Sequence, residues 1–329
     1  MRTWITLALS AVVFLAGCTG LIVHEKGDLE HQIDLSPLED RAVRIVRDGL
    51  ADENALVRNH AIEVVASTQR RQLMPKVLSL LSDSSIAVRF AAATAVGDLQ
   101  YAAGEYPVRH MLNDRDANVQ IAAAYALARL GKPENVDHIR KATKSTDQTV
   151  RANAVLLLGR LGDRNDLPLV YEMLYSSEST DQVRFQAVES IAMLKDQRIY
   201  RDRLWALLIS KFADDRVMGI RGMAALGTTE AKDAIITMLD DEVVEVRLCA
   251  AGELGRLDDP VGQTEVIAYF ERANPNLDEP SVANTLAAMA VGHIGTEPLK
   301  KYLPRLLQSR SRVVQLGAAQ SVLLLAGSR

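Results

Sequence analysis

Small and large apolar residues recur with a regular spacing from residue 54 to the end of the chain. Each repeat has a lead residue that is usually apolar, a small residue four positions later and a large aliphatic residue eight positions later. The nine lead residues are Val57, Val88, Val119, Val150, Val183, Met218, Val246, Ala283 and Val314. They are 28 to 37 residues apart, a period typical of stacked-repeat proteins.

The spacing within each repeat predicts a helix. Positions zero, four and eight share one face of an α-helix and do not share one face of a strand. Three positions before the lead residue, seven of the nine repeats carry Asn, Ser, Asp or Thr, side chains that cap helix N-termini. At the two exceptions, Pro280 predicts a helix that begins one residue earlier, and Asp240 or Asp241 is expected to cap in place of Val243.

A second, amphipathic helix separates successive repeats. Examples are residues 73–81, 167–174, 204–212, 234–239 and 299–307, and a leading helix at 37–50 completes the first pair. A single helical hairpin cannot bury its apolar face, so each hairpin depends on its neighbours. The pattern therefore predicts an all-α protein, an α-α superhelix of about nine helical hairpins over residues 36–329 that grows as a curved rod.

The best-preserved repeats also carry a recognisable motif. Residues 83–97 read DSSIAVRFAAATAVG, and residues 114–128 read DRDANVQIAAAYALA. This motif resembles a HEAT repeat of the short kind named after phycobilisome lyases. The resemblance implies a HEAT/armadillo-like solenoid and leaves the function open, because such repeats serve scaffolds, adaptors, lyases and hydroxylases.

The amino terminus has the features of an export signal. A short basic start at Arg2 precedes residues 4–16, which are apolar except for Thr6 and Ser10. Thirteen residues are too few to span a bilayer. The sequence LAGC at 15–18 resembles the lipobox of bacterial lipoproteins, and the alternative is an ordinary signal peptide followed by a stray cysteine.

The lipobox resemblance implies a lipoprotein signal peptide at 1–17 and lipidation of Cys18. Residues 18–35 would then be a lipidated tether. Several acyl chains, palmitate among them, would hold Cys18 stably in a membrane. Thr19 at the next position implies an exported protein on the outer membrane, facing the periplasm.

Charge and cysteine content exclude some functions. The net charge is −4, which argues against nucleic acid as a partner because that binding needs a clustered basic face. With only Cys18 and Cys249, no internal disulfide forms if Cys18 is acylated. Cys249 is expected to pack as a small apolar residue, and the sequence leaves its reactivity open.

No catalytic, cofactor-binding or metal site is expected. Deoxyhypusine hydroxylase is an enzyme that resembles two sets of such repeats. Its repeats carry several His-Glu pairs, which together hold two iron ions. Here the only His-Glu pair is His24-Glu25, in the tether. Acidic residues open several repeats and an Arg often follows the lead residue, and we interpret them as a structural ladder between repeats. They are Asp52, Asp83, Asp114 and Arg58, Arg89, Arg151, Arg184, Arg247.

A binding surface is expected on the inner side of the superhelix. Positions three, six and ten after the lead residue would face inward, and Tyr and Arg are enriched where partners dock. The candidate partner-binding residues are Tyr125, Arg129, Arg160, Glu189, Met193 and Arg221. The first three come from adjacent repeats and are expected to meet.

The last helix, at 313–325, has more than one apolar face. Leu316, Leu323 and Leu324 lie away from the stripe of Val314 and Val322, whereas an end repeat should present a polar outer face. We expect another protein or a second copy of the chain to cover it, which would give self-association through the carboxyl-terminal helix.

These observations favour a membrane-anchored, non-enzymatic scaffold or adaptor that binds protein partners. The alternative is an enzyme or enzyme subunit of the HEAT-repeat lyase or hydroxylase type. A third hypothesis is a structural tether within the envelope.

Overall fold

The computed structural model describes residues 34–272 and 275–327. The predicted signal peptide, nearly all of the predicted tether and Cys18 lie outside the described residues. Every regular element in the described part is helical, which confirms the all-α class. None of the described helices is long and apolar enough to cross a membrane.

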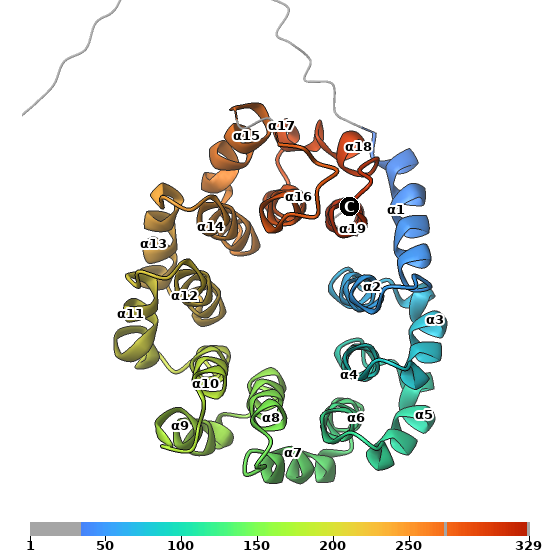
Figure 1. The fold of residues 1–329 in the computed structure, drawn as a ribbon, viewed down its shortest axis with the longest axis vertical. Coiled ribbons are helices and arrows are strands. Elements are labelled where there is room, and N and C mark those ends of the chain that lie inside the picture. The colour runs from blue at the N-terminus through green and yellow to red at the C-terminus, as the bar shows by residue number, and fades with distance from the viewer. Residues whose placement is uncertain (1–33, 273–274, 328–329) are drawn as a thin grey trace, which may run out of the picture. The chain divides into compact units, whose positions relative to one another are not determined.

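Nine helices form the inner layer of the unit Ile33–Arg329 (Figure 1). They are α2 (Ala55–Ser67), α4 (Ile86–Asp98), α6 (Ala117–Arg129), α8 (Gln148–Leu161), α10 (Asp181–Met193), α12 (Ala213–Leu226), α14 (Val244–Arg256), α16 (Val282–Ile294) and α19 (Arg312–Gly327). Together with the outer helices they make nine hairpins in the described part, so the predicted α-α superhelix is confirmed.

Helices that are mostly shorter, α1 excepted, form the outer layer. They are α1 (Ser36–Gly49), α3 (Met74–Ser79), α5 (Glu105–His110), α7 (Val136–Ala142), α9 (Leu167–Tyr175), α11 (Trp205–Leu208), α13 (Thr229–Thr237), α15 (Gln263–Arg272), α17 (Glu297–Lys300) and α18 (Leu303–Leu306). Many are extended by 3₁₀ turns, and a π-turn, Tyr200–Leu204, precedes α11. The core lies between the two layers.

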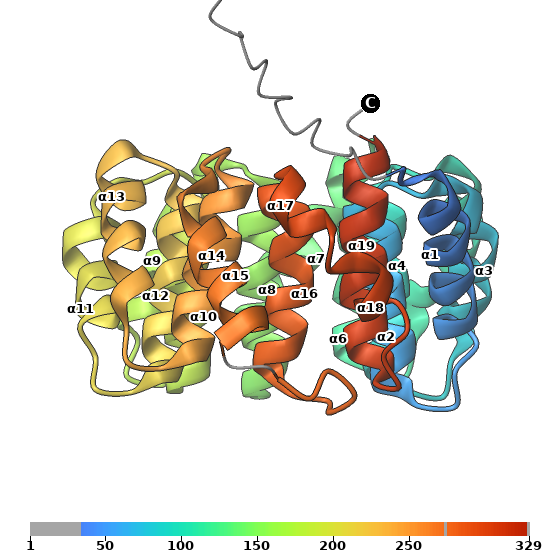
Figure 2. The ribbon, with the colours of Figure 1, turned by 90° about the horizontal axis from the view of Figure 1, so that it is seen from above.

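The unit closes into a ring, because α19 packs against α1 and α2 (Figures 1 and 2). Leu316 and Leu323 of α19 are only 2% and 1% exposed. The curved rod expected from the sequence was therefore wrong, and so was the expected cover of the last helix. The chain's own first hairpin covers this apolar face, so the helix does not need a second molecule for that purpose.

Polar contacts reinforce this seam between the chain ends. Arg70 Nη2 donates to the carbonyl oxygen of Leu323 at 2.9 Å, and Gln320 Nε2 donates to Ser67 Oγ at 3.2 Å. Gly49 of α1 permits the close approach, because a Cβ there would lie 3.2 Å from Leu316 Cδ2 and 3.0 Å from the Ala61 Cβ.

Arginine–aspartate pairs link successive repeats at Arg58 and Arg89, as the ladder interpretation predicts. Arg184 departs from the ladder, because it pairs with Asp181 of its own helix. Arg58 forms a bidentate pair with Asp83, with both N–O distances 2.8 Å, and Arg89 forms one with Asp114, at 3.0 Å each. Asp83 Oδ1 also accepts the backbone N–H of Ser85 at 2.8 Å. Each aspartate thus orders its own loop and holds the guanidinium of the preceding repeat.

The pKa values of these aspartates reflect the pairing. Burial alone would raise the pKa of Asp83 and Asp114. The hydrogen bonds from Arg58 and Arg89 and from the backbone outweigh that effect, so both pKa values lie below the ordinary value. The two carboxylates therefore stabilise the fold in their ionised form.

The lead residue predicted for the sixth repeat, Met218, was wrong. Met218 is half-buried, whereas the other eight lead residues are buried. Arg216 is the fourth residue of α12, as Arg89 is of α4, and it pairs with Asp241 at 2.7 and 2.8 Å. The lead position is therefore Asp215, and Asp215 accepts from Ser210 Oγ at 2.6 Å instead of capping a helix.

The predicted N-caps are partly right. Asn54, Asp116 and Asp147 accept backbone N–H groups in the first turn of their helices. Ser85 and Thr180 stand at the N-cap without such a bond. The start predicted before Pro280 was wrong, because α16 begins at Val282 with Ser281 as its cap.

We expect Arg89→Ala to lower the free energy of unfolding by about 3 kcal/mol, because Asp114 would be left as a poorly solvated, unpaired carboxylate. Urea denaturation followed by circular dichroism measures this. The control is Arg109→Ala, which removes a guanidinium whose side chain is 52% exposed and which, within the described part of the chain, pairs only with Glu105. That change should cost less than about 1 kcal/mol.

The same pair predicts an acid dependence of stability. Because the folded pKa of Asp114 is lowered, its contribution is complete above the unfolded value of about 3.9 and is lost as the pH falls through the folded value. The loss of stability in Arg89→Ala should therefore shrink below that pH. An Arg89→Ala effect that is equal at pH 7 and at pH 3 would contradict the assignment.

Ring closure predicts a crosslink between distant parts of the sequence. In a Cys249→Ala background, Ser67→Cys with Gln320→Cys should react efficiently with a short bis-maleimide, because the native side chains touch. The crosslinked chain should migrate anomalously on a denaturing gel. Ser67→Cys with Thr146→Cys, on the loop before α8, is the control and should crosslink poorly. Equal crosslinking of both pairs would rule out a defined seam.

Candidate functional site

The inner helices enclose two cavities among the described residues that together receive most of the predicted site residues. The first cavity measures about 900 Å³ and is lined from α2, α4, α6 and α8 and the loop before α8. Ile62, Ile86, Phe90 and Leu156 supply its apolar lining. Asn59, Glu63, Asn153 and Arg160 are among its polar lining residues. This mixture suits an extended chain with alternating side chains better than a small apolar molecule.

A cluster around Asp98 borders the first cavity. Tyr125 Oη donates to Asp98 Oδ1 at 2.5 Å, and Arg160 pairs with Asp98 Oδ2. The Arg160 guanidinium also lies 5.4 Å from the centre of the Tyr125 ring. Asp98, Tyr125 and Arg160 belong to α4, α6 and α8, so the cluster ties three consecutive repeats together.

Within this cluster the predicted residues have different environments. Tyr125 is 1% exposed, so its ring packs in the core and is not presented on the surface. Burial, together with the charge of Asp98, raises the pKa of Tyr125, and the phenol remains a hydrogen-bond donor. Arg129 makes only a long contact, 3.5 Å from its Nε to the carbonyl oxygen of Gly97. Arg160, with its side chain 31% exposed, is the predicted residue of this group that lines the cavity, together with Asp98.

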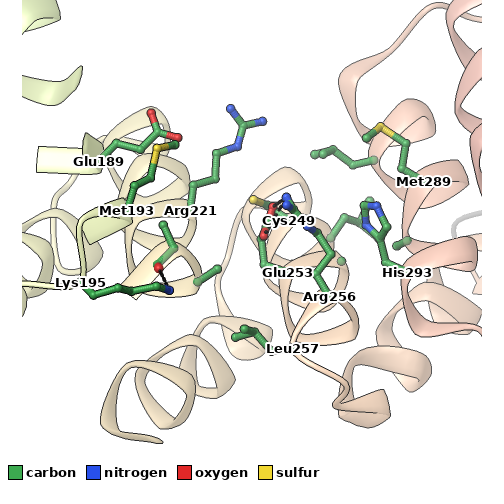
Figure 3. A pocket seen from close by; sticks show the side chains of 16 residues that line it. Glu189, Met193, Lys195, Arg221, Cys249, Glu253, Arg256, Leu257, Met289 and His293 are labelled. Atoms are coloured by element: carbon green, nitrogen blue, oxygen red, sulfur yellow. Dashed lines mark hydrogen bonds and ion pairs between the residues drawn. The ribbon is translucent and has the colours of Figure 1, made fainter. Parts of the chain in front are cut away.

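The second cavity measures about 510 Å³ and lies between α10, α12, α14 and α16 (Figure 3). It contains Glu189, Met193 and Arg221, the other three predicted residues. The structure thus divides the six predicted residues into one group per region. Whether either group binds a partner stays a prediction.

Four polar lining residues of the second cavity were missed in the sequence. They are Lys195, Cys249, Glu253 and Arg256, whereas His293 stands ten positions after the lead residue Ala283 and fits the inward-facing spacing. Cys249 and Arg256 follow the lead residue Val246 by three and ten positions, so the spacing rule used for the other candidates would have found them. Glu253 follows by seven positions, and no signal in the sequence marks it.

Burial perturbs the ionisation of three of these groups. It lowers the pKa of His293 to about 4, with a smaller contribution from the charge of Arg256. It raises the pKa of the Cys249 thiol to about 12, aided by the charge of Glu253. The pKa of Glu253 is also raised by burial, against the opposing effect of Arg256. At neutral pH, His293 is therefore neutral and Cys249 is a protonated thiol.

The Cys249 thiol of the second cavity is not activated as a nucleophile. A thiolate is the reactive form of cysteine, and the Cys249 thiol is held in its protonated form. Glu253 is occupied by Arg256, whose Nη1 lies 3.3 Å from each carboxylate oxygen. Among the described residues, no group of three or more His, Cys, Asp or Glu side chains is placed to hold a metal ion.

Comparison with known proteins agrees with the repeat architecture. Residues 43–108 and 107–192 match the family model of HEAT repeats, so this part of the chain is similar to HEAT repeats. No curated protein matches the chain.

Solved structures resemble the chain weakly. The complex of CpcE and CpcF of phycocyanin lyase from Nostoc sp. PCC7120 gives a TM-score of 0.45 at 18% identity, over 70% of this chain and 91% of that one. Human deoxyhypusine hydroxylase gives 0.38 at 17% identity, over 80% and 99%. Kap121p gives 0.33 at 14% identity, over 87% and 38%. At these values the resemblances carry no argument about activity.

The perturbed histidine gives a pH-dependent prediction. The folded pKa of His293 is about 4 and the unfolded value is about 6.5. As the pH falls, His293 is therefore protonated in the unfolded chain before it is protonated in the folded protein. The contribution of His293 to stability should fall as the pH falls from about 6.5 to about 4. Glu253, whose pKa is raised, has the opposite slope above its unfolded value.

The difference in stability between the wild type and His293→Gln separates the effect of His293 from that of Glu253. Stability measured by urea denaturation at several pH values should fall less steeply with acidification in His293→Gln than in the wild type. In NMR titrations the ring signal lost in this variant should titrate near pH 4. A signal that titrates near 6.5 would contradict the buried, neutral assignment.

Proposed function

We propose that the protein is a membrane-anchored, non-enzymatic scaffold or adaptor that holds a protein partner on the inner face of its ring. The first cavity carries the proposal. It is lined by side chains from four inner helices, and Phe90 and Leu156 lie on it among polar groups. An apolar side chain in a polar rim is the arrangement that interfaces use.

The length of the first cavity favours an extended segment of the partner. Four neighbouring inner helices make three steps of about 8–10 Å each, or about 25–30 Å. A fully extended chain covers about 3.3–3.6 Å per residue, so about eight residues would reach across. The apolar side chains would bury alternate residues of that segment, and the asparagines would supply hydrogen bonds to its backbone.

The membrane anchor is supported by the sequence at the amino terminus. The lipobox-like LAGC at 15–18 and the preceding apolar stretch favour export and acylation of Cys18. The proposed location is the outer membrane, on its periplasmic side. A lipid at Cys18 would concentrate the scaffold on a surface and leave its inner face for a partner.

Partner binding is tested with a variant of the inner face. Phe90→Glu with Leu156→Glu places two carboxylates on the first cavity and should abolish capture of any partner that docks there. Crosslinking in intact cells, affinity capture through the carboxyl terminus and mass spectrometry measure this. The control is Tyr106→Glu, which changes a side chain that is 74% exposed on outer helix α5.

The decisive result is a stoichiometric protein captured by the wild type and by Tyr106→Glu and lost from the inner-face variant. A partner retained equally by all three would place its binding elsewhere. Circular dichroism confirms that each variant is folded before the comparison is made.

Lipidation is tested by Cys18→Ala. We expect this change to move the protein from the membrane fraction to the soluble fraction and to abolish incorporation of labelled palmitate. Cys249→Ala is the matched control and should leave both unchanged, because Cys249 is buried. Membrane association that survives Cys18→Ala would exclude a lipid on Cys18 as the anchor.

A further inference from the structure

Arg221 is a charged group of the second cavity without an ionic partner. Its side chain projects from α12 and is exposed (Figure 3). It makes no ion pair with any residue in the described part of the chain, and its charge lowers the pKa values of the nearby Cys249 thiol and Glu253 carboxyl against the opposing effect of burial. An unpaired guanidinium in a cavity is poised for an anion.

The other charged groups of the cavity are already engaged. Glu253 is paired with Arg256, and Glu189 Oε2 accepts from Gln186 Nε2 at 2.9 Å. Lys195 Nζ donates to the carbonyl oxygens of Ala225 and Leu226 at the end of α12. None of these engagements involves Arg221.

The charges of the lining do not cancel. Three cationic side chains, Lys195, Arg221 and Arg256, face two anionic ones, Glu189 and Glu253. Three positive and two negative side chains give the lining a net charge of +1. His293 adds none at neutral pH, because burial lowers its pKa to about 4.

Apolar side chains line opposite sides of the second cavity. Met193 from α10 and Met289 from α16 flank the cavity (Figure 3), and Leu248 and Leu286 complete its apolar lining. Methionine side chains adapt to varied apolar shapes. A volume of about 510 Å³ falls within the range of about 300–1,000 Å³ that small-molecule sites occupy.

We infer that the second cavity binds one carboxylate that is attached to an apolar body. The carboxylate pairs with the Arg221 guanidinium, which has the fork geometry for two parallel hydrogen bonds. The apolar body lies against Met193, which stands beside Arg221 (Figure 3). Two sources carry this chemistry, a free small organic acid and the carboxyl-terminal residue of a peptide. The inference goes beyond the scaffold proposal and does not depend on it, since it concerns the other cavity.

The test uses the full chain and two matched probes, N-acetylleucine and N-acetylleucinamide, which differ only in the carboxylate. Calorimetric titration at pH 7 should show the acid binding at least tenfold more tightly than the amide. Arg221→Gln should abolish this preference. Arg201→Gln, on the exposed π-turn before α11, is the control and should preserve it.

A second variant tests the apolar contact. Met193→Ala should weaken both probes about tenfold and keep the preference for the acid. Unfolding curves that match the wild type show that a loss of binding is not a loss of fold. The inference is overturned if the acid and the amide bind the wild type equally, if neither binds at millimolar concentration, or if Arg221→Gln retains the preference.

The two sources are separated with a peptide. Acetyl-Ala-Ala-Leu with a free carboxyl terminus should bind more tightly than N-acetylleucine if the site accepts the end of a chain, and more weakly if it accepts a free acid. Either order, with the acid preferred over its amide, supports the site. Failure of these titrations would leave partner capture at the first cavity unaffected, so the two proposals fail separately.

Discussion

The packing of α19 on α1 and α2 is the contact on which the rest of the unit depends. It covers Leu316 and Leu323 with helices from the other end of the chain, and complete burial of one leucine side chain contributes about 1.5–3 kcal/mol. An open stack would expose these side chains at one end and the core of the first hairpin at the other. Closure gives each terminal hairpin a neighbour, so neither needs a polar cap.

Between the seam and the opposite side of the ring, the repeats are held together by recurring contacts. Small residues four positions after the lead residues, such as Ala92 and Ala123, are fully buried and let inner helices approach closely. Bidentate pairs such as Arg89 with Asp114 then set the orientation of one repeat on the next. Apolar packing and directional charge pairing thus act together where one repeat meets the next, as at Ala92 and Arg89 of α4.

The inner face is where this regularity ends, and that is where the two cavities lie. In the first cavity, Tyr125 and Arg160 both bind the carboxylate of Asp98, so these polar groups have partners within the cluster. The rest of the lining is apolar or rich in amide side chains. In the second, the ion pairs leave the Arg221 guanidinium unmatched. Side chains that recur at the same position in every repeat are explained by the stacking of the repeats. Side chains in the two cavities do not recur in this way, and this favours a role in binding. The two cavities are suited to different ligands, an extended chain and a single carboxylate.

The sequence by itself determined the helical hairpins and the Arg–Asp pairs of Arg58 and Arg89, because period, capping residues and pairing positions are local and recur. It misplaced the lead residue of the sixth repeat at Met218, since an apolar residue one turn further along imitates the pattern. Tyr125 was identified as facing inward, but its burial beside Asp98 depends on neighbouring repeats. Closure of the ring was decided only by the tertiary structure. It follows from the sum of small rotations between successive hairpins, and no single repeat encodes that sum.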